Sequence, residues 1–213
     1  DAELTADDKT RLLDFLSVYG ALGEGKVYEG SDRSGYQLEP TGLNAGSKPS
    51  EAIPMKELIA EGYVGEMLAA HMTYFETARF KHPEERLYHA DKAKGVNTWT
   101  VTSGHGIDAL CTTAGEFAEL SGVLSAQTKE WTAIDTGKVV SVDSPDHILV
   151  QGRLENGALA TVRVAALPQH PAGIRLEVYG SEGALLATTP DRSSEQVKLV
   201  GGRSGEPEMT ELE

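Results

Sequence analysis

The sequence predicts an α+β fold in which helices cover one face of a broad, mostly antiparallel β-sheet. Three observations support this class. Apolar residues recur at helical spacing in separate segments, all of which lie before Gly115. From Leu120 onward, apolar and polar residues alternate along short segments, as in strands with one buried face. Short turns separate these segments and favour antiparallel neighbours, and Asn156-Gly157 is the strongest hairpin signal.

The composition is that of an ordinary globular protein and excludes several classes of function. The chain has 213 residues, of which 39% are hydrophobic and 24% charged, enough to build a core without staples. The formal net charge of −14 opposes binding to nucleic acid or to anionic membranes. Cys111 is the single cysteine, and no signal peptide or membrane-length apolar run is present. We therefore expect a cytoplasmic protein without nucleic-acid or membrane partners.

Three regions are expected along the chain. Residues 1–50 combine one helix, which ends at Gly20, with an irregular segment rich in Gly, Ser and Pro. The glycines from Gly20 to Gly25 follow a helix rather than a strand, which favours a turn over a phosphate-binding loop. Residues 51–200 form the α+β domain, and residues 201–213 form an acidic tail.

The elements of the α+β domain follow in order. A helix is predicted over residues 50–61, and Gly62 ends it. The charged stretch 80–93 contains histidines and acidic residues without a metal-ligand spacing, so we interpret it as a solvated loop or lid. Strands are predicted at residues 65–78, 120–129, 146–154, 158–166, 174–179, 184–187 and 196–200.

The stretch from Asn97 to Glu116 is the most informative about chemistry. A β-type run over residues 99–102 breaks at Ser103, which is expected to cap the helix that follows. Gly115 is expected to take a left-handed conformation after the end of that helix. Its apolar stripe consists of Ile107, Leu110, Cys111 and Ala114, and the opposite face carries His105, Asp108 and Thr112. The pattern places an imidazole at a helix N-terminus, between two glycines that leave room for a ligand.

Three segments resemble, in this order, the C-terminal domain of the Gfo/Idh/MocA (glucose–fructose oxidoreductase / inositol dehydrogenase) family. They are MKELIAEGYVGEMLAAHMTYF (55–75), SGHGIDALCTTAGEFAELSGVLSAQ (103–127) and RLEVYGSEGALL (175–186). The middle segment is most similar to the branch that contains the fungal galactose-pathway repressor. The resemblance implies that the sheet forms the substrate site and usually the oligomer interface, so we expect a homo-oligomer through the sheet face.

The resemblance also implies the chemistry. The family consists of NAD(P)-dependent oxidoreductases of sugars or polyols, in which a separate Rossmann domain holds NAD or NADP. We find no strand–Gly-rich loop–helix unit and no Glu-Lys-Pro motif, so we expect no cofactor and no metal on this chain alone. The family histidine maps to His105, but Val101 occupies the position where active members carry an aspartate. The alternative is therefore a non-catalytic sugar-sensing or protein-binding regulator, and a third is a dimerisation module.

Two catalytic and three substrate-binding residues follow from this resemblance. A neutral His105, with an ordinary pKa near ~6.5, is suited to take the proton of a sugar hydroxyl, whereas many histidines are only hydrogen-bonded structure. Asp108 is suited to orient that ring, or it is an acid that favours the helix dipole. The candidate substrate-binding residues are Asn97, Trp99 and Thr112, of which Trp99 stacks on a sugar ring or else belongs to the core.

Overall fold

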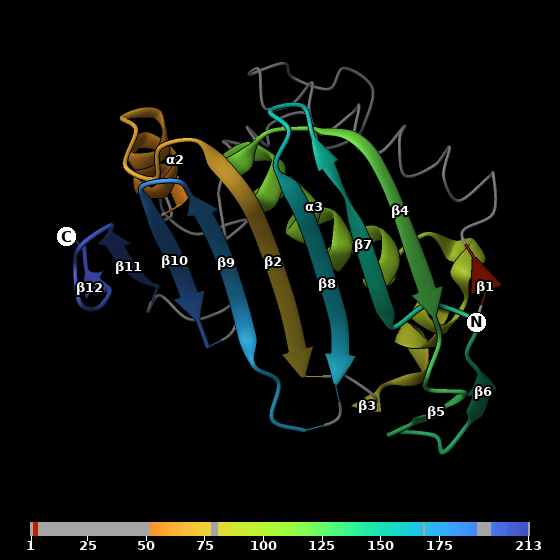
Figure 1. Cartoon of the computed structure of the whole chain (residues 1–213). Helices are drawn as coiled ribbons and strands as arrows, with labels where there is room; N and C mark the ends of the chain where they lie inside the picture. Colours follow the sequence, from red (N-terminus) through yellow and green to blue (C-terminus); the bar gives the residue numbers. More distant parts are fainter. Residues whose placement is uncertain (1, 4–51, 78–80, 168, 191–196, 213) are drawn as a thin grey trace, which may run out of the picture.

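The computed structural model describes the chain from residue 52 onward with short gaps, together with two residues near its start. The described residues are 2–3, 52–77, 81–167, 169–190 and 197–212. Over these residues the chain forms a nine-stranded sheet, a three-stranded sheet and a few helices, which confirms the α+β class (Figure 1). The helix expected before Gly20 and the glycine cluster after it lie outside the described residues.

The large sheet is mostly antiparallel. From one edge to the other, its strands are β1 (Ala2–Glu3), β4 (Phe117–Ser125), β7 (His147–Leu154), β8 (Leu159–Leu167), β2 (Met67–Thr77), β9 (Gly173–Gly180), β10 (Gly183–Thr189), β11 (Lys198–Arg203) and β12 (Thr210–Glu211). Neighbours are antiparallel except β2 and β8, which are parallel. All the strands predicted from alternation are present, within a few residues of their expected ends.

The position of β2 is the main feature of the sheet that the sequence pattern did not predict. Sequential antiparallel strands were expected, but β2 lies between β8 and β9, with Ala69 opposite both Leu159 and Tyr179. Parallel neighbours require a long crossover. Here the crossover contains α3 (Ser103–Ala114), which packs across one face of β2 and β8.

α3 uses its predicted apolar stripe for this packing. The residues of the stripe are all buried in the core: Ile107, Leu110, Cys111 and Ala114. At Gly106 a Cβ atom would be in van der Waals contact with the sheet, 3.4 Å from Val164 Cγ2 and 3.7 Å from Tyr74 Cβ, so a larger side chain would not fit without a shift. Gly115 ends the helix with a positive φ of +107°, which favours glycine, but its ψ of 169° is extended and differs from the left-handed helical conformation that was predicted. Figure 1 shows α3 behind β8, on the same side of the sheet as α2 (Ala52–Ala60).

The start of this helical segment differs from the prediction. Residues 99–102 were expected to form a strand, but they belong to a π-helical turn, η3 (Thr98–Thr102), that runs directly into α3. The prediction is wrong because Asn97 and Thr100 form a reciprocal capping box with N···O distances of 3.2 Å, which starts the helix earlier. The expected cap at Ser103 is also wrong, since that residue is already helical and its hydroxyl donates to the carbonyl oxygen of Trp99.

The charged stretch 80–93 contains short regular elements rather than a plain loop or lid. These are β3 (Lys81–His82) and two 3₁₀ helices, η1 (Glu84–Ala90) and η2 (Lys92–Lys94). β3 pairs with β5 (Glu130–Ala133), which in turn pairs with β6 (Val139–Ser141), to give the three-stranded sheet. Strands of two to four residues are too short to show a period-two pattern, so the sequence did not indicate them.

The region set apart as an acidic tail continues the large sheet. β11 extends to Arg203, and Thr210 of β12 lies opposite Gly201. The expected boundary at residue 201 therefore falls inside a strand. Among the described helices, none combines the length and the apolar character that crossing a bilayer would require.

The other face of the large sheet, which we call the open face, carries apolar side chains among charged ones. Figure 1 views this face from the front, and neither α2 nor α3 lies over it. Val123 and Leu149 are opposite each other on β4 and β7 and are 41% and 52% exposed. Leu159 and Tyr179 share the face, because both are in register with Ala69 on β2, and both are exposed.

The close approach at Gly106 generates a stability prediction. Gly106→Val should lower the free energy of unfolding by about 1 to 3 kcal/mol, because the added methyl groups have to displace Val164 or Tyr74. Urea unfolding followed by circular dichroism measures this change. Thr112→Val is the matched control, since it places the same side chain on the outward face of the same helix. Equal effects of the two substitutions would contradict the packing described above.

Candidate functional site

The outward face of α3 carries the predicted polar residues. His105, Asp108 and Thr112 are all half-buried there, as the helical spacing predicts. Because the helical segment begins at Thr98, however, His105 lies about two turns inside it rather than at its N-terminus. The positive end of the helix dipole is therefore near Asn97 instead. The two glycines beside the imidazole are buried, so their small size serves packing rather than ligand access.

Asp108 is an unusual acid on this face. Burial raises the pKa of its carboxyl to about 6, and the charge of Glu116 acts in the same direction. The carboxyl therefore titrates close to neutral pH, within a helical turn of His105. Burial also raises the pKa of the Cys111 thiol, with a further contribution from Glu116, which leaves that cysteine an unreactive core residue.

A cavity of about 270 Å³ lies at the start of the same helical segment. It is enclosed by the ends of β2 and β8, by η1, by η3, by β5 and by the loop before β7. The residues around it are Glu76, His82, Arg86, His89, Val96, Asn97, Thr98, Val101, Thr102, Trp131, Ser144, Pro145, Asp146 and Ala166. Val101 precedes His105 by four residues, so the cavity and the outward face of α3 are neighbours along one helix.

Two buried hydrogen-bond donors beside this cavity have no acceptor among the residues that the structure describes. Asn97 is 5% exposed; its Oδ1 accepts from the N–H of Thr100, but no described residue accepts from its Nδ2. Trp131 Nε1 is likewise buried without an acceptor among the described residues. Buried donors of this kind are rare in folded proteins and call for an explanation, such as a bound water or ligand.

Aromatic rings form one wall of the cavity. The His82 ring lies 4.7 Å from the Trp131 ring and 6.0 Å from the His89 ring, between ring centroids. Tyr88 stacks on the other side of His89 at 4.3 Å. Burial lowers the pKa of His89, helped by the nearby Arg86 charge and opposed by the backbone of Val96. The lowered pKa keeps the His89 ring largely uncharged at neutral pH.

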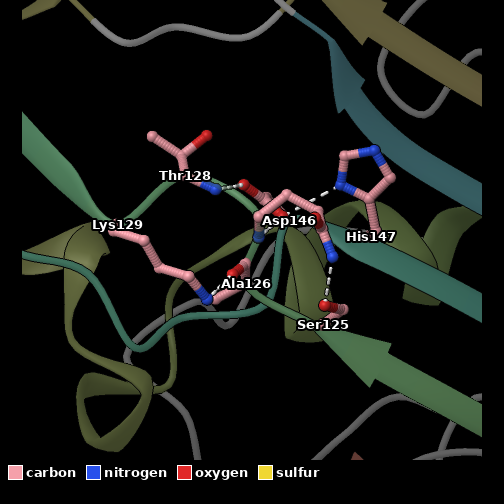
Figure 2. Close-up of polar contacts among 7 residues, drawn as sticks. Ser125, Ala126, Thr128, Lys129, Asp146 and His147 are labelled. Atoms are coloured by element: carbon pink, nitrogen blue, oxygen red, sulfur yellow. Dashed lines mark hydrogen bonds and ion pairs between the residues drawn. The ribbon is translucent and has the colours of Figure 1, made fainter. Parts of the chain in front are cut away.

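Asp146 connects the cavity to the large sheet (Figure 2). Its carboxylate accepts from the N–H of Gln127 at 2.7 Å and from that of Thr128 at 2.9 Å. Its Oδ1 is also 2.9 Å from His147 Nδ1. Burial by itself would raise the pKa of Asp146, but these hydrogen bonds outweigh it and lower the pKa. We interpret this carboxylate as an ionised anchor of the β4–β5 connection, because it accepts from two backbone N–H groups of that connection and contacts the ring of His147.

The predicted site residues fall into three places. Asn97 borders the cavity, and the outward residues of α3 lie about two to four turns further along the same helical segment. Trp99 is buried in the core, so it takes the structural role that was the alternative to stacking on a sugar ring. No cluster of three or more potential ligand side chains in the described residues could hold a metal ion.

Sequence reasoning missed Glu76, Trp131 and Asp146 as parts of the cavity. It noted His82 and His89 only as residues of a charged loop. Glu76 is bound to the segment by Thr102, whose hydroxyl donates to Glu76 Oε1 at 3.0 Å. These residues come from distant parts of the chain, and no spacing in the sequence links them.

Comparison with known proteins places the domain among two groups. A family model described as "Gal80p, C-terminal domain" matches residues 51–189, more than half of the chain. The dehydrogenase aclE of Aspergillus oryzae is 27% identical over 149 residues, which are 66% of this chain and 40% of that protein. The galactose/lactose metabolism regulatory protein GAL80 of Kluyveromyces lactis is 31% identical over 122 residues, 53% of this chain and 26% of that protein. The chain thus spans between about a quarter and two fifths of the length of these curated relatives.

Solved structures give the same two groups. The transcriptional regulator Gal80p of Kluyveromyces lactis has a TM-score of 0.64 at 25% identity, over 78% of this chain and 43% of that chain. An NAD-binding oxidoreductase of Klebsiella pneumoniae has a TM-score of 0.65 at 16% identity, over 75% and 43%. Levoglucosan dehydrogenase in complex with NADH and levoglucosan has a TM-score of 0.61 at 22% identity, over 76% and 44%. At these identities, the likeness to the last two shows a shared fold alone.

The raised pKa of Asp108 generates a prediction about stability and pH. Its folded-state pKa of about 6 exceeds the unfolded value of 3.8, so the folded state binds the proton more tightly. Its contribution to stability is present below pH 3.8 and is lost as the pH rises through 6. Asp108→Asn should therefore be more stable than the native chain by up to about 3 kcal/mol above pH 7, and the gain should vanish near pH 4.

Urea unfolding across this pH range measures the difference between the two proteins. Glu155→Gln is the control, because it removes an exposed acid from the hairpin after β7. A difference between Asp108→Asn and the native chain that does not change with pH would contradict the burial of this carboxyl.

Proposed function

The chain belongs to the family of the Gal80p C-terminal domain, and from that premise we propose that it is the substrate-binding and oligomerisation domain of an NAD(P)-dependent sugar or polyol oxidoreductase. The family match and the relatives confirm the resemblance to the C-terminal domain of the Gfo/Idh/MocA family. The observation that carries the proposal is that His105 and the cavity lie along one helical segment. Two buried donors at the cavity have no acceptor among the described residues.

The residues of α3 are suited to proton transfer at a sugar hydroxyl. An imidazole on the outward face takes a hydroxyl proton when it is neutral, and it releases the proton to water afterwards. Asp108 lies on the same face, three residues later, and its raised pKa lets it share a proton near neutral pH. If a sugar ring binds in the cavity beside Val101, the end of the ring nearest α3 would point along the helix toward His105.

The chain's described residues do not fit the dinucleotide itself. A pyrophosphate site of the Rossmann type needs a strand, a glycine-rich loop and the N-terminus of a helix in sequence. No such unit occurs in the ranges that the structure describes. We therefore assign NAD or NADP to another domain of the full-length protein and derive no hydride step from these residues.

A regulator without catalysis is the second candidate function. Val101 occupies the position of the family aspartate, and its side chain is exposed beside the cavity, where it can neither orient an imidazole nor bind a hydroxyl by hydrogen bonds. The GAL80 proteins of two yeasts, 31% and 32% identical over 122 residues, are regulatory proteins by name. In this alternative, the cavity would sense a sugar and the open face or α3 would contact a protein.

The open face supports the oligomerisation part of the proposal. It exposes Val123, Leu149 and Leu159 on the adjacent strands β4, β7 and β8, and Tyr179 on β9 beyond β2. Charged residues lie among them: Arg175 donates to Glu177 at 3.0 Å, and the Tyr179 hydroxyl donates to the same carboxylate at 2.8 Å. A broad sheet face with a mixed apolar and paired-charge surface is suited to pack against a second copy of itself.

The catalytic role of His105 can be tested in a full-length protein that carries this domain. His105→Ala should lower kcat for the sugar substrate by roughly a hundredfold or more, as expected for loss of a general base. His170→Asn is the control, since it changes an exposed histidine in the β8–β9 loop and keeps a residue that tolerates its positive φ. An unchanged kcat would move His105 to a structural role and favour the regulator.

The oligomer can be tested by light scattering on this chain at tens of micromolar. We expect a mass greater than that of one chain, and Leu149→Lys should shift the population toward the monomer, because it places a charge in the centre of the open face. Ile134→Lys is the matched control, because that residue is also highly exposed but lies beyond β5 in the small sheet. A native chain that is monomeric at this concentration would remove the interface.

A further inference from the structure

The turn between β7 and β8 is attached to the end of α3 by an asparagine side chain. Asn156 Nδ2 donates to the carbonyl oxygen of Ala114, the last residue of α3, at 2.9 Å. Its Oδ1 accepts from the N–H of Ala158 at 3.1 Å. The carbonyls of the last helical turn have no partner within the helix, so the Asn156 amide satisfies one of them from outside. The side chain therefore connects a strand turn to the helix that carries His105 and Asp108.

The residue after Asn156 makes this side chain chemically reactive. Gly157 has a positive φ of +90°, and a Cβ atom built there would have no heavy atom within 4 Å. Both residues are exposed. Because glycine has no side chain, its backbone nitrogen can approach the side-chain amide carbon of Asn156 with little steric hindrance. Asn97, in contrast, is 5% exposed and is followed by the β-branched Thr98.

We propose that Asn156 is a site of spontaneous deamidation and that the reaction releases the β7–β8 turn from the end of α3. The Gly157 nitrogen loses its proton and forms a bond to Cγ of Asn156, the bond from Cγ to Nδ2 breaks, and ammonia leaves with that proton. The resulting cyclic imide takes up a water molecule, which opens it at either carbonyl to give an aspartyl or an isoaspartyl residue. Water is the co-reactant, so no oxidant or reductant is needed.

The folded turn slows the reaction by holding its groups in place. The Gly157 N–H donates to the carbonyl oxygen of Leu154 at 2.9 Å, and the Asn156 amide is held by Ala114 and Ala158. These contacts have to open before the imide ring can close. They lie in an exposed turn, where local opening costs far less free energy than unfolding of the whole domain. The native chain therefore reacts through its open turns, and more slowly than the unfolded chain.

The product of the reaction weakens the contact with α3. An aspartyl residue lacks the Nδ2 donor, and its carboxylate meets the carbonyl oxygen of Ala114 at the negative end of the helix dipole. Glu116 follows just beyond the same helix end and adds a like charge. The end of α3 therefore loses a hydrogen bond and gains a repulsion, and both favour fraying of its last turn.

The modification is tested by ageing the 213-residue chain in mildly alkaline buffer, with and without guanidinium chloride. Trypsin releases residues 154–163, which contain Asn156, and residues 95–129, which contain Asn97. Compared with the unaged chain, the first peptide should gain the mass of an amide-to-acid change and be labelled by an isoaspartate-specific methyltransferase, and the second should not. The reaction should be severalfold faster in the denaturant. Asn156→Gln is the control, because its longer side chain would have to close a larger and less favourable ring.

The release of α3 is tested by hydrogen–deuterium exchange. Asn156→Asp reproduces the aspartyl product, and the aged native chain, separated by ion exchange, supplies the product without a substitution. In both, the amides of residues 112–116 should exchange about fivefold to thirtyfold faster than in the unmodified chain, the effect of a lost hydrogen bond and an unfavourable charge at a helix end. Gln151→Glu is the control, because it makes the same amide-to-acid change on an exposed residue of β7 and should leave this exchange unchanged.

Each measurement can overturn its part of the inference. If Asn156 is modified no faster than Asn97, it is not a deamidation site. Equal rates with and without denaturant would mean that the turn contacts do not hold the amide. Unchanged exchange at the end of α3, in both Asn156→Asp and the aged chain, would overturn the release. All these outcomes are independent of sugar turnover by the full-length protein, so they leave the proposed function to its own tests.

Discussion

The parallel pairing of β2 with β8, with α3 packed over it, is the constraint on which the rest of this domain depends. The two strands are joined by a long connection that contains α3, and this helix contacts both of them. At Gly106 the helix lies against Tyr74, Val162 and Val164, where a Cβ atom would already be in van der Waals contact. Once α3 is fixed in this way, His105 and Asp108 face outward and the start of the helical segment lies at the cavity.

Asn97 links the structure of this segment to its chemistry. Its side-chain oxygen caps the first turn and so decides where the helix begins, several residues before the expected start. The same amide has a second atom, Nδ2, which the cap leaves unused beside the cavity. An aspartate would cap equally well without a free donor. The choice of an amide at this position is therefore not explained by helix capping alone.

The elements that could be predicted are those whose pattern is local. Alternation along Ile148–Leu154 and the Asn156-Gly157 turn predicted the β7–β8 hairpin, and the spacing of Ile107, Leu110 and Ala114 predicted the buried side of α3. The run Thr98–Thr102 was misinterpreted because β-branched residues favour strands in general, whereas burial of Trp99 and the Asn97 cap favour a helix here. The small sheet was missed because its strands are too short to carry a period.

Residue order along the chain was sufficient for the α+β class and for the buried and outward sides of α3, because helical and strand periodicities are encoded within a few neighbouring residues. Tertiary contacts decided the place of β2 in the sheet, the enclosure of the cavity by β5 and η1, and the raised pKa of Asp108. Each of these depends on which distant segments exclude water from a given side chain, and no local pattern records that. Trp131 shows the difference most clearly, since only folding brings its indole beside Asn97.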